Sequence, residues 1–260
     1  MALHVESRLP AKRQDEVYRL LKERRFASIK ELADLLGVSE MTIRRDLRFL
    51  EQKGSVRRIF GGAQLVEEQV AFEEGYRKRL AQNLKAKEVI ARIARQLVSR
   101  GDTIALDGST TSVYFARELK QQRIIVVTNS LLVAETLAGG QARVLLTGGE
   151  FRTITQTLVG PLAEECLDNL YFDKVFFSAK GLMPHGFVDS HPEEAGVKRR
   201  MLSRAGQRIA LLDSTKFGVR ALHVLIPLEE VDFLVTERPV PEEYNVLVQQ
   251  ARIALLVGED

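Results

Sequence analysis

The feature that most restricts the fold of this chain is a pair of short amphipathic segments separated only by Gly37-Val38-Ser39. The first segment opens at Ser28 with Glu31 three residues later, a pairing that caps a helix N-terminus from both sides. Gly37 can adopt the left-handed conformation that ends a helix, and Ser39 is suited to cap the next one. Such a short turn forces two helices to cross steeply, so the sequence predicts a helix-turn-helix. The apolar stripe of the first segment comprises Ile29, Leu32, Ala33 and Leu36.

The helix predicted after Ser39 runs through Glu51 or Gln52, and an earlier helix is predicted over residues 11–24. At 100° per residue its aliphatic edge, which faces the core, comprises Ile43, Leu47 and Leu50. The rest of its surface carries Met41, Thr42, Arg44, Arg45 and Arg48. Arginine binds guanine or phosphate, and threonine bonds a base edge or packs on a thymine methyl, so this surface suits a DNA major groove. A basic face that is merely solvated is the alternative.

Two β-prone runs follow, on either side of Gly61-Gly62 in the segment from Ser55 to Val66. A two-residue glycine turn between such runs is typical of a β-hairpin, and a hairpin in this position is a wing. Arg57 and Arg58 on its first strand are predicted to lie along a phosphate strand. They would add affinity without sequence choice.

Basic charge is concentrated at the N-terminal end. Residues 1–66 carry 14 Lys and Arg against 9 Asp and Glu, whereas the remaining 194 residues carry 24 against 26. A local basic excess on a near-neutral body indicates a polyanion contact confined to one end. A non-specific, nucleoid-type binder would show the same excess, so charge alone leaves that alternative open.

These elements resemble the DNA-binding module of the DeoR family of bacterial regulators. The resemblance is carried by the string Ser39–Leu47, Ser-Glu-Met-Thr-Ile-Arg-Arg-Asp-Leu, and by Gly61-Gly62-Ala63. It implies a helix-turn-helix over about Ala27 to Asp46, with double-stranded operator DNA as the partner. Asp46 departs from a purely basic face and is expected to orient a neighbouring arginine. The residues expected at the DNA are Ser39, Met41, Thr42, Arg44, Arg45, Arg48, Arg57 and Arg58.

From Leu84 onward, helical and β-prone segments alternate. Helices are predicted over 84–98, 111–120, 130–138, 161–169, 192–204 and 241–249. Strands are predicted over 103–107, 123–128, 142–147, 173–178, 207–212, 222–226, 232–236 and 252–257. Several strands, including 124–127 and 209–212, are apolar throughout, which is expected when helices cover both faces of a parallel sheet. Residues 67–83 are polar without a clean period and are predicted to be a linker.

Ligands of parallel α/β sheets bind in the crevice beyond the carboxyl ends of the strands, and several loops there have suitable chemistry. Asp107–Thr111 joins a strand to a helix, so its hydroxyls and N–H groups can cradle an anion. Thr147–Arg152 offers two glycines and an arginine that can clamp a phosphate or carboxylate. Each loop by itself is also explained as an ordinary helix cap or surface loop.

Two further loops have ligand-binding chemistry. Asp213–Gly218 places Lys216 as a phosphate partner, and Thr128-Asn129-Ser130 offers an amide and hydroxyls that can orient a polyol. Pro192 with Glu193 and Glu194 begins another helix. These carboxylates suit the positive end of that helix and could also bond sugar hydroxyls.

In order along the chain, these loops extend the DeoR resemblance over about residues 11–258. The family's sensor domain is similar in fold to sugar-phosphate isomerases and CoA transferases, and its usual effectors are phosphorylated sugars or polyols. The resemblance implies phosphate binding by Ser109, Thr110, Thr111 and Lys216, with Asp107, Asn129, Arg152 and Lys180 contacting the rest of the ligand. Lys180 lies in a segment, 178–181, that departs from the small, glycine-containing family pattern, and this points to a different effector or an added anion contact.

The main alternative is an enzyme, a sugar-phosphate isomerase with a DNA-binding appendage. Asp107, Asp213, Lys180 and Lys216 supply acid and base groups at predicted strand ends. The regulator interpretation assigns no catalytic residue and no cofactor, and it predicts a repressor of a carbohydrate-use operon. It also predicts a homo-oligomer, a dimer or tetramer, because paired half-sites multiply the DNA contact of one small module.

The remaining composition restricts location and chemistry. The single cysteine, Cys166, cannot form an internal disulfide and fits a reducing cytoplasm. No apolar run approaches the ~18–20 residues that span a bilayer, and residues 1–10 do not resemble a signal peptide. The four histidines show no metal-ligand spacing. The predicted organisation is an α+β winged helix-turn-helix at 10–66, a linker at 67–83 and an α/β effector-sensing domain at 84–258.

Overall fold

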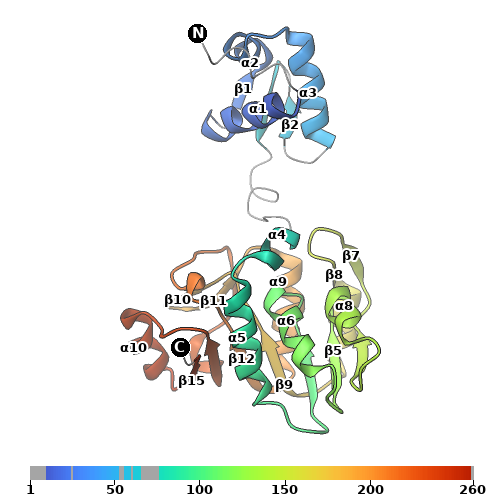
Figure 1. The fold of residues 1–260 in the computed structure, drawn as a ribbon, viewed down its shortest axis with the longest axis vertical. Helices are drawn as coiled ribbons and strands as arrows, with labels where there is room; N and C mark the ends of the chain where they lie inside the picture. The colour runs from blue at the N-terminus through green and yellow to red at the C-terminus, as the bar shows by residue number, and fades with distance from the viewer. Residues whose placement is uncertain (1–9, 25, 53–55, 60, 66–75, 259–260) are drawn as a thin grey trace. The chain divides into compact units, whose positions relative to one another are not determined.

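The computed structural model describes residues 10–24, 26–52, 56–59, 61–65 and 76–258 (Figure 1). The chain divides into two compact units, Met1–Glu74 and Gly75–Asp260. Each unit contains hydrophobic clusters of its own.

Three helices form the N-terminal unit: α1 (Pro10–Arg24), α2 (Ile29–Leu36) and α3 (Glu40–Gln52). The predicted helix signals are confirmed. The Ser28 hydroxyl accepts from the Glu31 N–H while the Glu31 carboxylate accepts from the Ser28 N–H. Gly37 ends α2 with φ 63°. The Ser39 hydroxyl accepts from the N–H of Thr42 at 3.2 Å, which caps α3.

The N-terminal core is built from the predicted aliphatic edges. Ile43 and Leu47 of α3 are fully buried and pack with Val17 and Leu21 of α1 and Leu32 of α2. Since these side chains lock the rotation of α3 about its axis, the polar side of that helix must point outward.

The wing is a three-stranded antiparallel sheet rather than a hairpin alone. Its strands are β1 (Phe26–Ser28), β2 (Val56–Ile59) and β3 (Gly62–Leu65), in the order β1-β3-β2. Ile59 pairs with Gly62, so Gly62 lies in a strand and not in the predicted Gly61-Gly62 turn. Gly61 takes the positive φ of that turn, at 81°. Gly62 belongs to β3, where a side chain would collide with the carbonyl oxygen of Ala27.

A seven-stranded sheet with all neighbours parallel forms the centre of the C-terminal unit. Its strands, in spatial order, are β15 (Ala254–Val257), β14 (Phe233–Thr236), β12 (Ala205–Leu211), β9 (Phe172–Phe177), β4 (Thr103–Leu106), β5 (Ile125–Thr128) and β6 (Arg143–Leu146). This confirms the predicted α/β class.

Helices cover both faces of this sheet (Figure 1). One face carries α5 (Leu84–Arg95), α6 (Thr110–Leu119) and α7 (Leu131–Leu137), and the other carries α8 (Pro161–Asp168), α9 (Pro192–Ser203) and α10 (Glu242–Gln250). Successive residues of β9 show the division: Phe176 packs in the first core and Phe177 in the second. Because both strand faces are buried, the apolar strands lack a period-two pattern.

Four short strands of the described C-terminal unit were missing from the sequence prediction, in addition to β1 of the N-terminal unit. β7 (Glu150–Arg152) and β8 (Thr157–Val159) form an antiparallel hairpin. β10 (Gly181–Met183) and β11 (Gly186–Asp189) join β13 (His223–Ile226) in a small separate sheet. Three or four residues are too few to show a hydrophobic period, so their polar and glycine residues led to a prediction of loops.

The predicted linker, 67–83, is not one uniform segment. Its part from 67 to 75 lies outside the described residues. Tyr76–Ala81 forms helix α4 of the C-terminal unit. The reason is local packing, since Tyr76 is buried in the core that also contains Tyr114 of α6.

Candidate nucleic-acid interface and ligand site

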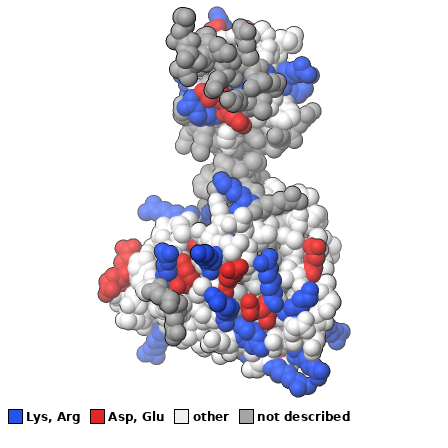
Figure 2. Space-filling model, in the orientation of Figure 1, with Lys and Arg blue, Asp and Glu red and all other residues white. Residues whose placement is uncertain are grey.

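The outward side of α3 presents the residue types predicted for DNA contact. Met41 is 74% exposed, and Arg44, Arg45 and Arg48 are exposed as well. Figure 2 shows Lys and Arg side chains at the edge of the N-terminal unit where α3 lies. A row of cations and small polar groups beside a rigid aliphatic edge is a surface that fits a groove.

Three of the predicted DNA residues at the start of α3 already have local partners. Ser39 and Thr42 share a hydrogen bond between their hydroxyls at 2.9 Å, so Ser39 serves first as the helix cap. Arg44 reaches back to Glu40, with 3.4 Å between its guanidinium nitrogen and the carboxylate. Both side chains of that pair are about half exposed, and such pairs contribute little, so Arg44 can exchange Glu40 for a phosphate.

The wing is fastened to the end of α3. The backbone N–H of Arg58 donates to Glu51 Oε1 at 3.0 Å, and its Nε donates to Oε2 at 2.6 Å. The first of these bonds is the largest cause that lowers the pKa of Glu51. Arg58 therefore links β2 to α3 as well as offering charge. The side chain of Arg57 lies outside the described part of the chain.

Asp46 does not orient a neighbouring arginine of α3, contrary to the prediction. It is 2% exposed and accepts two hydrogen bonds from Arg13 of α1, at 2.6 and 3.2 Å. Gln14 adds a third at 3.3 Å. The carboxylate is a buried tie between the first and third helices, and its partner lies 33 residues away, where no local pattern could show it.

The second candidate site is the edge of the C-terminal sheet where the strands end. Asp107, directly after β4, is fully buried and accepts from the Ser112 hydroxyl, the Ser178 N–H at 3.0 Å and the Ser109 N–H at 3.2 Å. Lys198 of α9 lies 3.1 Å from its second oxygen. Asp107 thus organises the loops around it, and its own acceptors are occupied.

Lys198 was not singled out from the sequence. Its ammonium donates to Asp189 at 2.6 Å and to the Ser178 carbonyl at 2.9 Å. Burial alone would lower the pKa of Lys198, but Asp189 and Asp107 outweigh it and raise that pKa. Burial likewise opposes the charge of Asp189, yet Lys198 holds the pKa of Asp189 below its ordinary value. These three groups form a buried charge centre behind the crevice.

The start of α6 offers backbone N–H groups. Ser109 caps the helix by accepting from the Ser112 N–H at 3.1 Å, and its hydroxyl donates to the Ser112 hydroxyl at 2.9 Å. The first N–H groups of any helix lack intrahelical acceptors, which leaves those of Thr110 and Thr111 for an anion. The Thr111 side chain itself is buried.

Helix α4 brings two residues that were predicted to lie in a linker. Tyr76 is 5% exposed, and neither its hydroxyl nor Nε of Arg79 has a hydrogen-bond partner among the described residues. Burial raises the pKa of Tyr76, and the charges of Asp107 and Glu194 raise it further, whereas the charge of Arg79 lowers it. A third orphan atom is Oδ1 of Asn129, whose amide nitrogen donates to the Leu158 carbonyl at 3.0 Å.

Basic groups gather around this edge. Burial lowers the pKa of Lys216, and the charges of Lys180, Arg79 and Lys198 lower it further against the opposing effect of Asp213. Lys216 and Lys180 were both predicted site residues, and their side-chain charges are close enough to repel each other. Cations held together in partial burial repel one another unless an anion lies between them.

Side chains of α5 and α6 donate hydrogen bonds to backbone carbonyls of α4 and the residue after it. Lys87 of α5 donates to the carbonyls of Arg79 and Gln82, the latter at 2.5 Å. Tyr114 donates to the Leu80 carbonyl at 3.2 Å. Burial lowers the pKa of Lys87 to about 8.

Arg152 of β7 is held in a network rather than extended toward solvent. Its guanidinium donates to the Thr155 hydroxyl at 3.0 Å and to Nε2 of His191 at 3.3 Å, and it lies 3.5 Å from Glu194. The β8 residue next in this network, Thr157, packs its methyl group against the backbone of Gly108. The hairpin therefore adjoins the loop that follows β4.

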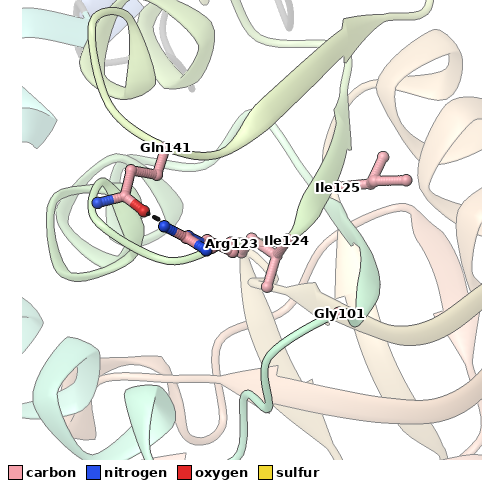
Figure 3. Close-up of a pocket in the computed structure, with 5 residues that line it drawn as sticks. All are labelled: Gly101, Arg123, Ile124, Ile125 and Gln141. Atoms are coloured by element: carbon pink, nitrogen blue, oxygen red, sulfur yellow. Dashed lines mark hydrogen bonds between the residues drawn. The ribbon is translucent and has the colours of Figure 1, made fainter.

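The opposite edge of the sheet has a hollow of about 560 Å³, lined by Gly101, Arg123, Ile124, Ile125 and Gln141 (Figure 3). Arg123 donates to the Gln141 side chain at 3.0 Å across it. These residues precede or begin β4, β5 and β6. None of the predicted effector residues lines this hollow.

Comparison with known families identifies both units. A DeoR-like helix-turn-helix domain matches residues 13–69, and a DeoR C terminal sensor domain matches residues 82–238. The chain belongs to the DeoR family. The sequence resemblance is confirmed.

Curated relatives of this DeoR-family chain cover most of it. The HTH-type transcriptional regulator GolR of Listeria innocua is 34% identical over 96% of this chain and 99% of its own length. The lactose phosphotransferase system repressor of Streptococcus mutans is 34% identical over 86% and 91%. A putative aga operon transcriptional repressor of Escherichia coli O157:H7 is 31% identical over 96% and 94%. These relatives are regulators, which decides for the regulator over the enzyme.

Among solved structures, ribose 5-phosphate isomerase A from Neisseria gonorrhoeae aligns with 52% of this DeoR-family chain and 53% of its own, at 15% identity and a TM-score of 0.38. The tetrameric eIF2B-beta2-delta2 complex from C. thermophilum aligns with 94% and 84%, at 14% identity and a TM-score of 0.44. None of the described helices has the length and apolar content that crossing a bilayer requires. No group of three or more His, Cys, Asp or Glu in the described ranges is placed to hold a metal ion.

Proposed function

We propose that this DeoR-family regulator reads operator DNA with α3 and positions itself with the wing. Support comes from the geometry of α3, whose core edge is fully buried while Met41, Arg45 and Arg48 are exposed. Neither arginine has an ion-pair partner within the described ranges. We assign base contacts to Met41, Thr42, Arg45 and Arg48, and phosphate contacts to Ser39, Arg44, Arg57 and Arg58.

Selection from random duplexes tests this assignment for any operator sequence. Wild-type protein should enrich one sequence, and Arg45→Ala should lose about 1–3 kcal/mol of preference for it. Arg92→Ala, on an exposed turn of α5, is the matched loss of one charge and should leave the selected sequence unchanged. A non-specific binder would enrich no sequence and would weaken equally on all duplexes.

We further propose that the effector is a phosphorylated sugar or polyol bound at the carboxyl edge of the sheet. The observation that carries this is the coexistence there of gathered cations and buried orphan atoms. A bound anion would relieve the repulsion among Lys216, Lys180 and Arg79. Oδ1 of Asn129 has no hydrogen-bond donor, and a ligand hydroxyl would supply one. A phosphate monoester of a polyhydroxy compound supplies both. Ser109, Thr110 and Thr111 complete the assigned site, and Asp107 and Arg152, whose polar groups are already engaged, hold the surrounding segments in place.

A thermal-shift comparison of phosphorylated sugars with the same sugars lacking phosphate tests the effector class. A ligand present at a hundred times its dissociation constant adds about 2.7 kcal/mol to stability, a shift that is easily measured. Lys216→Ala should abolish the shift, and Lys85→Ala on the exposed start of α5 should not. A shift with unphosphorylated sugars alone would refute the anion half of the site.

We propose that helix α4 couples effector binding to the DNA-binding unit. It is the first described element after residues 66–75, and it carries two of the orphan polar groups at the crevice, Tyr76 and Arg79. A ligand that engages them biases the placement of α4, and DNA affinity then changes by the ligand's differential affinity for the two arrangements.

The names of relatives that are repressors of a lactose phosphotransferase system and of an aga operon support a repressor of a carbohydrate-use operon. We place it in the cytoplasm, which the single cysteine fits. The module is small, so we propose a homo-oligomer, a dimer or tetramer, that binds paired half-sites. Light scattering of the purified chain would test this, and a monomer that binds a single half-site tightly would contradict it.

A further inference from the structure

His191 occupies an unusual position at the junction of β11 and α9. It is the residue before the first turn of α9, yet its side chain makes no capping hydrogen bond. The imidazole is 13% exposed, so it neither caps the helix nor points into solvent. A buried polar ring that does not cap the helix is expected to have a hydrogen-bond partner elsewhere.

Arg152 fixes the protonation of this ring. A guanidinium only donates, and Arg152 Nε donates to His191 Nε2 at 3.3 Å, so Nε2 must carry the lone pair. The neutral imidazole then has its proton on Nδ1. Nδ1 is buried and has no hydrogen-bond partner in the described part of the chain, and the nearest carboxylate oxygen, of Glu193, is 4.0 Å away. Nδ1–H is therefore an orphan donor.

The support around the ring is rigid. Arg152 donates to Thr155 at 3.0 Å, the hydroxyls of Thr155 and Thr157 lie 2.8 Å apart, and Thr157 donates to Glu194 at 3.0 Å. Since the Thr157 proton is used on Glu194, Thr155 donates to Thr157, and all donors run in one direction. This chain holds Arg152, and Arg152 holds the ring of His191.

The same network adjoins the effector crevice. Thr157 contacts Gly108 of the loop after β4 and bridges to Ser130, next to Asn129. Oδ1 of Asn129 is an orphan acceptor, and Nδ1–H of His191 is an orphan donor. Both residues are held by the β7–β8 hairpin, because Arg152 donates to His191 at 3.3 Å and Asn129 donates to the Leu158 carbonyl at 3.0 Å.

We propose that His191 Nδ1–H donates a hydrogen bond to a hydroxyl or carbonyl oxygen of the effector, and that His191 selects among phosphorylated polyhydroxy compounds by the position of that oxygen. The inference rests on the proposed effector site. It assigns the hairpin and α9 to the hydroxylated part of the ligand, and α6 with Lys216 to its phosphate. The orphan donor becomes satisfied only when an oxygen occupies that place.

The test measures affinity by calorimetry for glycerol 3-phosphate, ribose 5-phosphate, glucose 6-phosphate, fructose 6-phosphate and inorganic phosphate. His191→Leu removes the donor at similar volume, whereas His191→Asn keeps an N–H near the position of Nδ1. We expect His191→Leu to weaken the affinity for the tightest-binding sugar phosphate about tenfold, the usual size of one neutral hydrogen bond. The difference in affinity between that ligand and the other sugar phosphates should become smaller. Inorganic phosphate should bind both proteins equally, and His191→Asn should restore most of the loss.

The outcomes separate this inference from the proposed function. If a sugar phosphate binds wild type and His191→Leu equally, the role of His191 is refuted and the effector class stands. If none of the sugar phosphates binds wild type, both are refuted. If His191→Leu loses inorganic phosphate as well, or if His191→Asn fails to restore affinity while its melting temperature is normal, the residue has a structural role and the inference fails.

Discussion

Replacing Asp46 by alanine should destabilise the N-terminal unit, although it removes none of the proposed DNA-reading side chains. Asp46 is 2% exposed and the Arg13 side chain 9%, with 2.6 Å between their charged atoms. Removing one partner of a buried ion pair costs about 3–5 kcal/mol. Arg13 lies in the first turn of α1 and can turn toward water, so we take the lower end, about 3 kcal/mol.

Hydrogen exchange of the full chain, followed peptide by peptide, measures this loss where it occurs. A loss of about 3 kcal/mol corresponds to roughly hundredfold faster exchange of the protected amides of α3. Peptides of the C-terminal sheet should be unchanged and serve as the internal reference. The matched control is Asp34→Ala, which removes an exposed carboxylate from α2. If α3 exchanges no faster in Asp46→Ala than in that control, Asp46 is not the tie we describe.

Three further predictions concern the C-terminal unit. Lys198→Met should lower the free energy of unfolding by about 3–5 kcal/mol in urea titrations, because Asp107 and Asp189 would lose their buried cation; an unchanged midpoint would contradict this. The pKa of Asp189 is lowered in the folded state, so its contribution is present above its ordinary value of 3.8 and is lost as pH falls below it; Asp189→Asn should flatten that part of the acid melting curve. The pKa of Lys87 is lowered to about 8 from 10.5, so stability should rise between pH 8 and 10.5, where only the unfolded state stays protonated, and Lys87→Gln should remove the rise.

The sequence predicted those parts of the fold whose signals are local. The capping box of Ser28 and Glu31, the left-handed Gly37 and the cap at Ser39 each act over a few neighbouring residues, and all three appear in the structure. The apolar strands were found because both their faces are buried. The strands β1, β7, β8, β10 and β11 were missed because segments of three or four residues show no hydrophobic period.

The site was harder to predict because its decisive contacts are long-range. Lys198 belongs to a Lys-Arg-Arg run that looks like a solvated face, yet it pairs with Asp107, far earlier in the chain. Tyr76 and Arg79 lie in a polar stretch whose helix forms by packing on α6. Asp46 has its partner in another helix. Residue type suggested the loops after β4, β5 and β12, but only the fold shows which of their groups are already satisfied and which are left for a ligand.

The most direct test of the account is a fluorescence anisotropy titration of the selected duplex, with and without the sugar phosphate that gives the largest thermal shift. The wild-type Kd for DNA should change at least about tenfold at saturating ligand, a coupling of roughly 1.4 kcal/mol. Arg79→Ala should keep the ligand-free Kd and lose the change. A bound sugar phosphate that leaves the wild-type Kd for DNA unaltered would contradict the central claim that the crevice controls the DNA-binding unit.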